Sequence, residues 1–138
     1  MSATPGSAWV TGASQGIGRA LTLALAERGT RVAASARDES ALQVLGQERP
    51  NLLPAPLDVT DAKAVEAAVA EIERVQGPID LAVLNAGIYE PVPGGLAPPE
   101  LFRQHMEVNY QGVVNGLCAL LPRMKVRGDG QIAVLGSV

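Results

Sequence analysis

Three glycines in the run T-G-A-S-Q-G-I-G, residues 11–18, are spaced for chemistry at a phosphate group. The apolar segment 8–10 precedes them, so the chain is expected to pass sharply from a strand into a helix. Gly12 permits the tight turn, Gly16 leaves room for a pyrophosphate, and Gly18 lets the helix pack close to the sheet. Backbone N–H groups at the start of that helix then face the anion and add partial positive charge.

The other residues of this loop fit the same interpretation. Ser14 and Gln15 can add side-chain hydrogen bonds to a phosphate, and we assign Ile17 to the same cofactor-binding loop. The alternative is a glycine-rich turn that holds no ligand. The strand before the loop and the helix after it favour the binding site, because that context is what the motif requires.

The residues Ser35-Ala36-Arg37 end the second predicted strand, where the adenosine ribose of a dinucleotide would lie. A carboxylate there favours NAD, but Ala36 takes that position. Arg37 follows, and a guanidinium can pair with a 2′-phosphate through two hydrogen bonds. We therefore expect NADP (NADPH) to be preferred over NAD. In the alternative, Arg37 is an exposed loop charge that pairs with Asp38.

Short β-rich runs alternate with longer helical patterns, which indicates βαβ units and a parallel sheet covered on both faces. The expected strands cover residues 7–11, 31–36, 52–57, 79–84 and 131–135. The expected helices run from the glycine loop to Gly29, from Asp38 to Gly46, from Thr60 or Asp61 to Gln76, and from near 98–100 to about 126. The Pro- and Gly-rich stretch 85–99 is expected to be irregular.

The last helix carries several specific expectations. Leu101, Phe102 and Met106 are among its expected packing residues, and Pro122 is expected to kink or end its regular part. Cys118 is expected to be a small buried apolar residue.

Composition excludes several classes of protein. The chain has 138 residues, 47% hydrophobic and 18% charged, with a net charge of −3, which fits one folded domain and no nucleic-acid partner. One cysteine excludes an internal disulfide and fits a cytoplasmic location. The sequence predicts no membrane span, a disordered tail over residues 1–6 and a dinucleotide-binding domain over 7–138.

From Ala8 to Val138 the chain resembles the non-extended branch of the short-chain dehydrogenase/reductase family, whose cofactor loop has the spacing T-G-x-x-x-G-x-G. The resemblance implies an α/β fold of the Rossmann type, a doubly wound parallel sheet with about five strands in the order 3-2-1-4-5, without the family's C-terminal strands and helices. It implies that Asp58, with Val59, binds adenine; capping the turn into the next helix is a compatible role. It also places Asn85-Ala86-Gly87 beside the cofactor ribose, with Asn85 bracing the sheet.

The resemblance extends to part of a catalytic set. Asn109, in V-N-Y-Q-G, is expected to distort its helix and to join a proton relay, and Ser137 to orient a substrate carbonyl oxygen. The family's acid/base pair, Tyr-x-x-x-Lys, is not in these 138 residues, because Pro93 and Val114 stand four residues after Tyr89 and Tyr110. His105 is interpreted as a surface or packing residue, and no metal site is expected.

Two hypotheses follow. In the first, the chain is the N-terminal part of an NADP-dependent oxidoreductase that transfers hydride between NADPH and a small-molecule carbonyl or secondary alcohol, with little or no activity alone. In the second, it is a non-catalytic NADP-binding remnant or a partner of a full-length relative. Family members are usually homodimers or homotetramers. A flavodoxin-like domain is disfavoured because the loop lacks a Ser/Thr-rich cradle for FMN.

Overall fold

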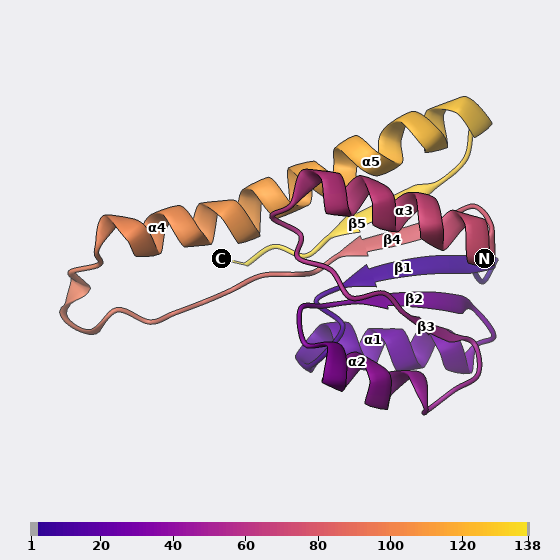
Figure 1. The fold of residues 1–138 in the computed structure, drawn as a ribbon, viewed down its shortest axis with the longest axis horizontal. Coiled ribbons are helices and arrows are strands. Elements are labelled where there is room, and N and C mark those ends of the chain that lie inside the picture. The colour runs from indigo at the N-terminus through magenta and orange to yellow at the C-terminus, as the bar shows by residue number, and fades with distance from the viewer. Residues whose placement is uncertain (1–2, 138) are drawn as a thin grey trace.

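A five-stranded parallel sheet forms the centre of the computed structural model, which describes residues 3–137 (Figure 1). The strand order is β3-β2-β1-β4-β5. The strands are β1 (Ser7–Thr11), β2 (Arg31–Ser35), β3 (Leu52–Pro54), β4 (Leu81–Leu84) and β5 (Gln131–Val134). The predicted Rossmann-type sheet and its strand order are confirmed.

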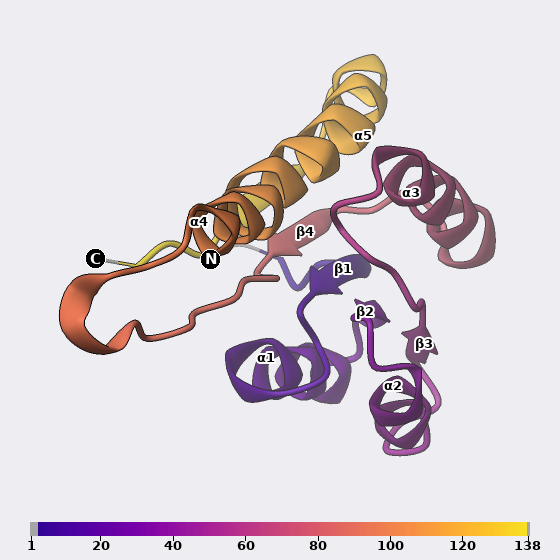
Figure 2. The same cartoon turned by 60° about the vertical axis from the view of Figure 1, so that its left-hand side comes forward.

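Helices cover both faces of the sheet. They are α1 (Gly16–Glu27), α2 (Glu39–Gly46), α3 (Ala62–Gln76), α4 (Pro99–His105) and α5 (Gly112–Arg127). Figure 2 shows α1 and α2 on one face, with α3 and α5 on the other. A π-helical segment, Met106–Gln111, joins α4 to α5, so the three form one long rod. No helix in the described part of the chain is long and apolar enough to span a bilayer.

The central strand β1 shows why both faces must be covered. Its side chains alternate between the faces, and all five residues are buried. Trp9 belongs to the core under α3 and α5, while Ala8 and Val10 belong to the core under α1 and α2. A continuous buried run of this kind is typical of a central parallel strand. It fixes the end of β1, and therefore the glycine loop, in the middle of the sheet.

Four strands are shorter than the sequence predicts. The second predicted strand ends at Ser35 and the fifth at Val134, each one residue early, and the fourth begins at Leu81 instead of Ile79. The third predicted strand, 52–57, is regular only over Leu52–Pro54. The chain beyond Pro54 still follows the end of β2, because the amides of Ala55 and Leu57 donate to the carbonyls of Ala34 and Ala36 at 2.8 and 3.0 Å.

The long rod differs from the sequence prediction in its packing. Phe102 and Met106 were expected to pack, but their exposed fractions are 64% and 57%. Cys118 is exposed as well, because Leu120 and Met124 lie on the buried face of α5.

Pro122 does not end α5, which continues to Arg127. Two arginines that follow the proline are tied to α3. Arg123 pairs with Glu66 at 2.8 Å, and Arg127 pairs with Glu73 at 3.0 Å. These contacts hold the helix together across the hydrogen bond that the proline cannot make.

The start of the chain was predicted to be disordered over residues 1–6. Residues 1 and 2, and residue 138 at the other end, lie outside the described residues. The Thr30 hydroxyl donates to the Pro5 carbonyl at 2.8 Å, and the Gly6 amide donates to the Asp80 carboxylate at 3.0 Å. Hydrogen bonds thus tie the residues just before β1 to the sheet.

Candidate functional site

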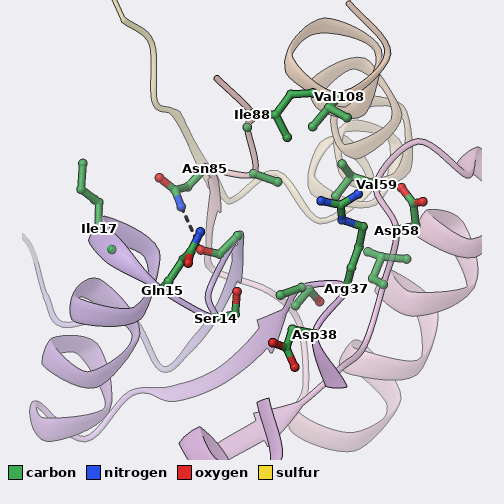
Figure 3. Close-up of a pocket in the computed structure, with 17 residues that line it drawn as sticks. Ser14, Gln15, Ile17, Arg37, Asp38, Asp58, Val59, Asn85, Ile88 and Val108 are labelled. Carbon is green, nitrogen blue, oxygen red and sulfur yellow. Dashed lines mark hydrogen bonds between the residues drawn. The ribbon is translucent and has the colours of Figure 1, made fainter. Parts of the chain in front are cut away.

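A groove of about 720 Å³ opens at the carboxyl ends of β1, β2 and β4 (Figure 3). Open parallel sheets bind ligands at this edge. Every predicted cofactor-binding residue except Gly18 lines the groove. Its lining residues are Gly12, Ser14, Gln15, Gly16, Ile17, Ser35, Ala36, Arg37, Asp38, Leu57, Asp58, Val59, Asn85, Ala86, Gly87, Ile88 and Val108.

The three loop glycines meet three different requirements. At Gly12, φ is +65°, and a Cβ there would lie 2.9 Å from the Ala86 Cα. Gly18 does not line the groove because it packs beneath the loop, where a Cβ would lie 2.1 Å from the Gly12 carbonyl oxygen. At Gly16, φ is +57° and a Cβ would meet no atom within 4 Å, so this position is open toward the groove.

The N-terminus of α1 differs from those of the next two helices. Asp38 caps α2 by accepting from the Ala41 amide at 2.9 Å, and Asp61 caps α3 by accepting from the Ala64 amide at 3.0 Å. Residue Gln15 precedes α1, makes no side-chain capping bond, and is followed by no acidic residue in the first turn. The first amides of α1 therefore keep their hydrogen-bonding capacity and partial positive charge for an anion in the groove.

Thr11 and Asn85 hold the glycine loop against the end of β4. The Thr11 hydroxyl accepts from the amides of Asn85 at 2.9 Å and Ala86 at 3.0 Å. The Asn85 side-chain amide donates to the carbonyls of Thr11 and Gly12, each at 3.2 Å. Asn85 thus braces two strand ends, as predicted. Thr11 was not among the predicted site residues, although a hydroxyl residue at the end of a strand was a usable signal.

Arg37 and Asp58 both line the groove beyond the ends of β2 and β3 (Figure 3). Arg37 is exposed and forms no ion pair with a carboxylate among residues 3–137, so the predicted alternative pairing with Asp38 is absent there. Its guanidinium therefore remains available to a ligand.

The Asp58 carboxylate stays ionised at neutral pH. It accepts from the Thr60 amide at 3.0 Å and from the Thr60 hydroxyl at 2.7 Å. These bonds hold the pKa of Asp58 below its ordinary value, and the positive charge of Arg37 adds to the effect. Asp58 therefore shapes the turn before α3, while Asp61 supplies the helix cap itself.

Asn109 lies in the π-helical segment, so the predicted helix distortion is confirmed. Its side-chain oxygen accepts from the Ile88 amide at 2.7 Å, and its NH₂ group donates to the Ile88 carbonyl at 2.9 Å. The same oxygen would lie 3.3 Å from a Cβ at Gly87. Asn109 thus holds the segment that follows β4 beside the groove.

Ser137 follows β5 and is exposed, but it does not line the groove. Its predicted role toward a substrate oxygen stays a prediction. Within the described range, no three His, Cys, Asp or Glu side chains come together in a way that could hold a metal ion.

Several groove residues were not predicted from the sequence. Ser35 lies at the end of β2, where its hydroxyl accepts from the Trp9 indole N–H at 2.9 Å. Asp38 and Leu57 follow strands, so their positions offered a signal. Ile88 and Val108 offered none, because the path of the irregular segment and the distorted helix decides where these apolar side chains lie.

Comparisons with known proteins agree with this geometry. The model of the family described as short chain dehydrogenase matches residues 7–138. An uncharacterized oxidoreductase of Myxococcus xanthus is 37% identical over 96% of this chain and 54% of its own length. Glycine betaine reductase ATRR of Emericella nidulans is 34% identical over 93% of this chain and 10% of its own length. The chain thus spans about half, or much less, of these relatives.

Solved structures show the same fold. A short-chain dehydrogenase from Streptomyces avermitilis superposes with a TM-score of 0.89 at 32% identity, over 99% of this chain and 51% of its own. Serine dehydrogenase complexed with NADP⁺ has a TM-score of 0.89 at 34% identity, over 96% and 54%. The 3-ketoacyl-(acyl-carrier-protein) reductase of Brucella melitensis, complexed with NADH, has a TM-score of 0.88 at 28% identity, over 95% and 56%.

Proposed function

Since the chain belongs to the short-chain dehydrogenase family, we propose that its groove binds NADP and that it serves an oxidoreductase acting on a small-molecule carbonyl or secondary alcohol. The observation that carries this proposal is the uncapped N-terminus of α1 beside Gly16, where a Cβ would meet nothing within 4 Å. A diphosphate is the ligand that this combination of free amides and open space fits best.

The preference for NADP rests on the end of β2. Ala36 offers no carboxylate to the ribose hydroxyls, while the Arg37 guanidinium is exposed and without an ion pair in the described chain. A free guanidinium at this edge is suited to a 2′-phosphate. Solved relatives bind either NADP⁺ or NADH, so the choice between the two cofactors has to be argued from the residues of this chain.

The remaining groove residues have complementary roles in this proposal. The ionised Asp58 would accept a hydrogen bond from the adenine amino group, with Val59 beside it. Ser14 and Gln15 would bond the pyrophosphate. Gly87 would let the nicotinamide ribose approach the backbone that Asn85 and Asn109 hold in place.

The bound nicotinamide would supply or accept the hydride. In this chain Ser137 would hold the substrate oxygen, and Asn109 would contribute to proton transfer through water. Because Tyr-x-x-x-Lys is not among the 138 residues, and acid–base assistance contributes about 10²–10⁴-fold, we expect these residues alone to show little or no turnover. The second candidate is a non-catalytic NADP-binding remnant or a partner of a full-length relative. A cytoplasmic location stays a prediction.

The decisive variant is Arg37→Asp. Loss of a charge-assisted pair with the 2′-phosphate should raise the dissociation constant for NADPH by about 10- to 100-fold. Binding of NADH should stay equal or become tighter, because the new carboxylate can accept from the ribose hydroxyls. Both constants are measured by nucleotide fluorescence on the purified chain.

Arg28→Asp is the matched control, because it makes the same charge change away from the groove. Arg28 lies at the C-terminus of α1, whereas the groove lies at its N-terminus. This control should leave the ratio of the two affinities unchanged. Equal weakening of both nucleotides by Arg37→Asp would show that Arg37 does not read the phosphate. Failure of the wild-type chain to bind either nucleotide would refute the proposed function. Binding without carbonyl reduction is the outcome that both candidates predict for these residues.

A further inference from the structure

Two side chains one turn apart on the long helical rod hold the extended segment that follows β4. Asn109 bonds both backbone groups of Ile88, at 2.7 and 2.9 Å. The His105 ring accepts at Nε2 from the Glu90 amide at 3.2 Å. The residues held, Ile88 and Glu90, alternate along the segment as bonded residues do along a strand. We call these four residues the helix clamp.

The segment depends on this clamp because little else can bond its backbone. It has left the sheet, since β4 ends at Leu84. Beyond Glu90 the chain carries Pro91 and Pro93, which have no N–H to donate. The helix clamp therefore takes the place of a neighbouring strand, and the segment it fixes includes Ile88, which lines the groove.

Elementary hydrogen-bond chemistry sets the protonation state of His105. Its Nδ1 lies 2.8 Å from the Leu101 carbonyl oxygen, which can only accept, so Nδ1 carries the proton. Its Nε2 faces the Glu90 N–H, which can only donate, so Nε2 is bare. The clamp thus requires the neutral ring in one tautomer. A second proton would place two N–H groups against each other.

We propose that His105 is a positioning residue for the cofactor groove. It holds the Gly87–Glu90 segment in place only while its imidazole is neutral. This inference rests on the proposed function, because the groove is taken to bind the dinucleotide. Imidazole is the side chain that changes charge between pH 5 and 8. Protonation of the ring should therefore release the clamp, and nucleotide binding should weaken with it.

The charged side chains of the two segments that meet at His105 are few. The loop contributes Glu90, and the helix contributes Glu100, Arg103 and Glu107. Arg103 pairs with both helical glutamates, so it neutralises part of their field. The hydrogen-bond geometry at the ring, and not a strong local charge, is what the release depends on.

His105 is the single histidine of the chain, which makes a spectroscopic test direct. Long-range ¹H–¹⁵N correlation spectra of the ¹⁵N-labelled chain report the tautomer of its ring. At pH 8 we expect the Nδ1–H form. Between pH 8 and 5 the backbone amides of Glu90 and Ile88 should shift with the same midpoint as the ring. An Nε2–H tautomer, or a Glu90 amide that ignores the titration, would overturn the inference whether or not a nucleotide binds.

Binding measurements then test the positioning role. His105→Ala removes the acceptor and should weaken NADPH binding at pH 8 by about 3- to 10-fold, the effect of one hydrogen bond. His105→Gln keeps a carbonyl that can accept from the Glu90 amide, so it should bind nearly as wild type at pH 8 and lack the imidazole-dependent loss at pH 5.5. Phe102→Ala, an exposed change on the same helix, is the control.

Two features of the design separate the possible outcomes. Because a 2′-phosphate itself gains a proton near pH 6, NADH serves as the second probe, and each variant is compared with wild type at the same pH. Wild-type affinity in His105→Ala at both pH values would overturn the positioning role. Absence of binding by the wild-type chain, with amides that still follow the ring, would refute the proposed function and leave the clamp intact.

Discussion

The centre of the sheet and its β5 edge follow the same strand chemistry but have different surroundings. β1 has a strand on each side and buries all five of its residues. β5 pairs only with β4, and Val134 within it is 51% exposed. Residues 3–137 therefore enclose the glycine-loop side of the molecule and leave the β5 side open.

The helices repeat this contrast. The apolar residues Val65, Val69 and Ile72 of α3 are buried against the sheet. On the long rod Phe102 and Met106 have helical spacing too, yet both are exposed. Amphipathic spacing predicts which residues share a face, but only the neighbouring elements decide whether that face is covered.

The largest effect should come from the enclosed side. In Gly18→Ala the new Cβ would lie 2.1 Å from the Gly12 carbonyl oxygen, and the backbone must shift to admit it. We expect the free energy of unfolding to fall by about 3 kcal/mol and NADPH binding to be lost. Denaturant unfolding and nucleotide fluorescence measure the two effects.

Gly136→Ala tests whether position matters more than residue type. Gly136 follows β5, and a Cβ there would meet no atom within 4 Å. Its stability and binding should match wild type. If Gly136→Ala lowered stability and NADPH binding as much as Gly18→Ala does, the contrast between the enclosed glycine-loop side and the open β5 side would be contradicted.

A smaller effect is expected at the open side. Val134→Lys places a charge on the exposed edge strand and should reduce self-association, because unpaired edges bind other chains. Stability should change by no more than about 0.5 kcal/mol, and NADPH affinity should not change. Sedimentation velocity at several concentrations measures the association.

Val44→Lys supplies the comparison for that variant. Val44 is 61% exposed but lies on a helix, α2, and not on a strand. If it lowers self-association as much as Val134→Lys does, general surface hydrophobicity and not the edge strand drives the association.

Another small effect concerns the stability contributed by Asp58. Its folded-state pKa is lowered by Thr60 and then by Arg37, so its charged form stabilises the native state above the unfolded-state pKa. That contribution disappears as the pH falls through the folded value, in the region below about pH 4. Asp58→Asn should therefore lower stability at pH 7 by less than about 1 kcal/mol, since solvent screens an exposed carboxylate.

Denaturant unfolding of Asp58→Asn at pH 7 and pH 3 checks the sign. The difference from wild type should shrink at pH 3. If the difference in the free energy of unfolding between wild type and Asp58→Asn were larger at pH 3 than at pH 7, the Thr60 hydrogen bonds would not favour the ionised form of Asp58.

Much of the fold could be predicted from local sequence, because its signals are local. Asp38 and Asp61 start helices where capping residues should, and the apolar run at β1 predicts a buried strand. Pro122 shows the limit. The sequence predicts a kink or an end, but ion pairs from Arg123 and Arg127 to α3 hold the helix through it.

The sequence itself determines the conformation of the glycine loop and the positive charge that follows β2. Gly12, Gly16 and Gly18 act through backbone geometry and close packing, which the absence of a side chain specifies directly. Arg37 brings its charge wherever the strand ends.

Tertiary structure alone decided the rest. Thr11 bonds residues 74 and 75 positions away, and His105 and Asn109 reach back across the loop to Glu90 and Ile88. Such contacts depend on how distant segments pack, and the same polar side chains could have faced solvent instead. Sequence spacing carries periodic and steric information, but it does not specify which distant backbone group a side chain will meet.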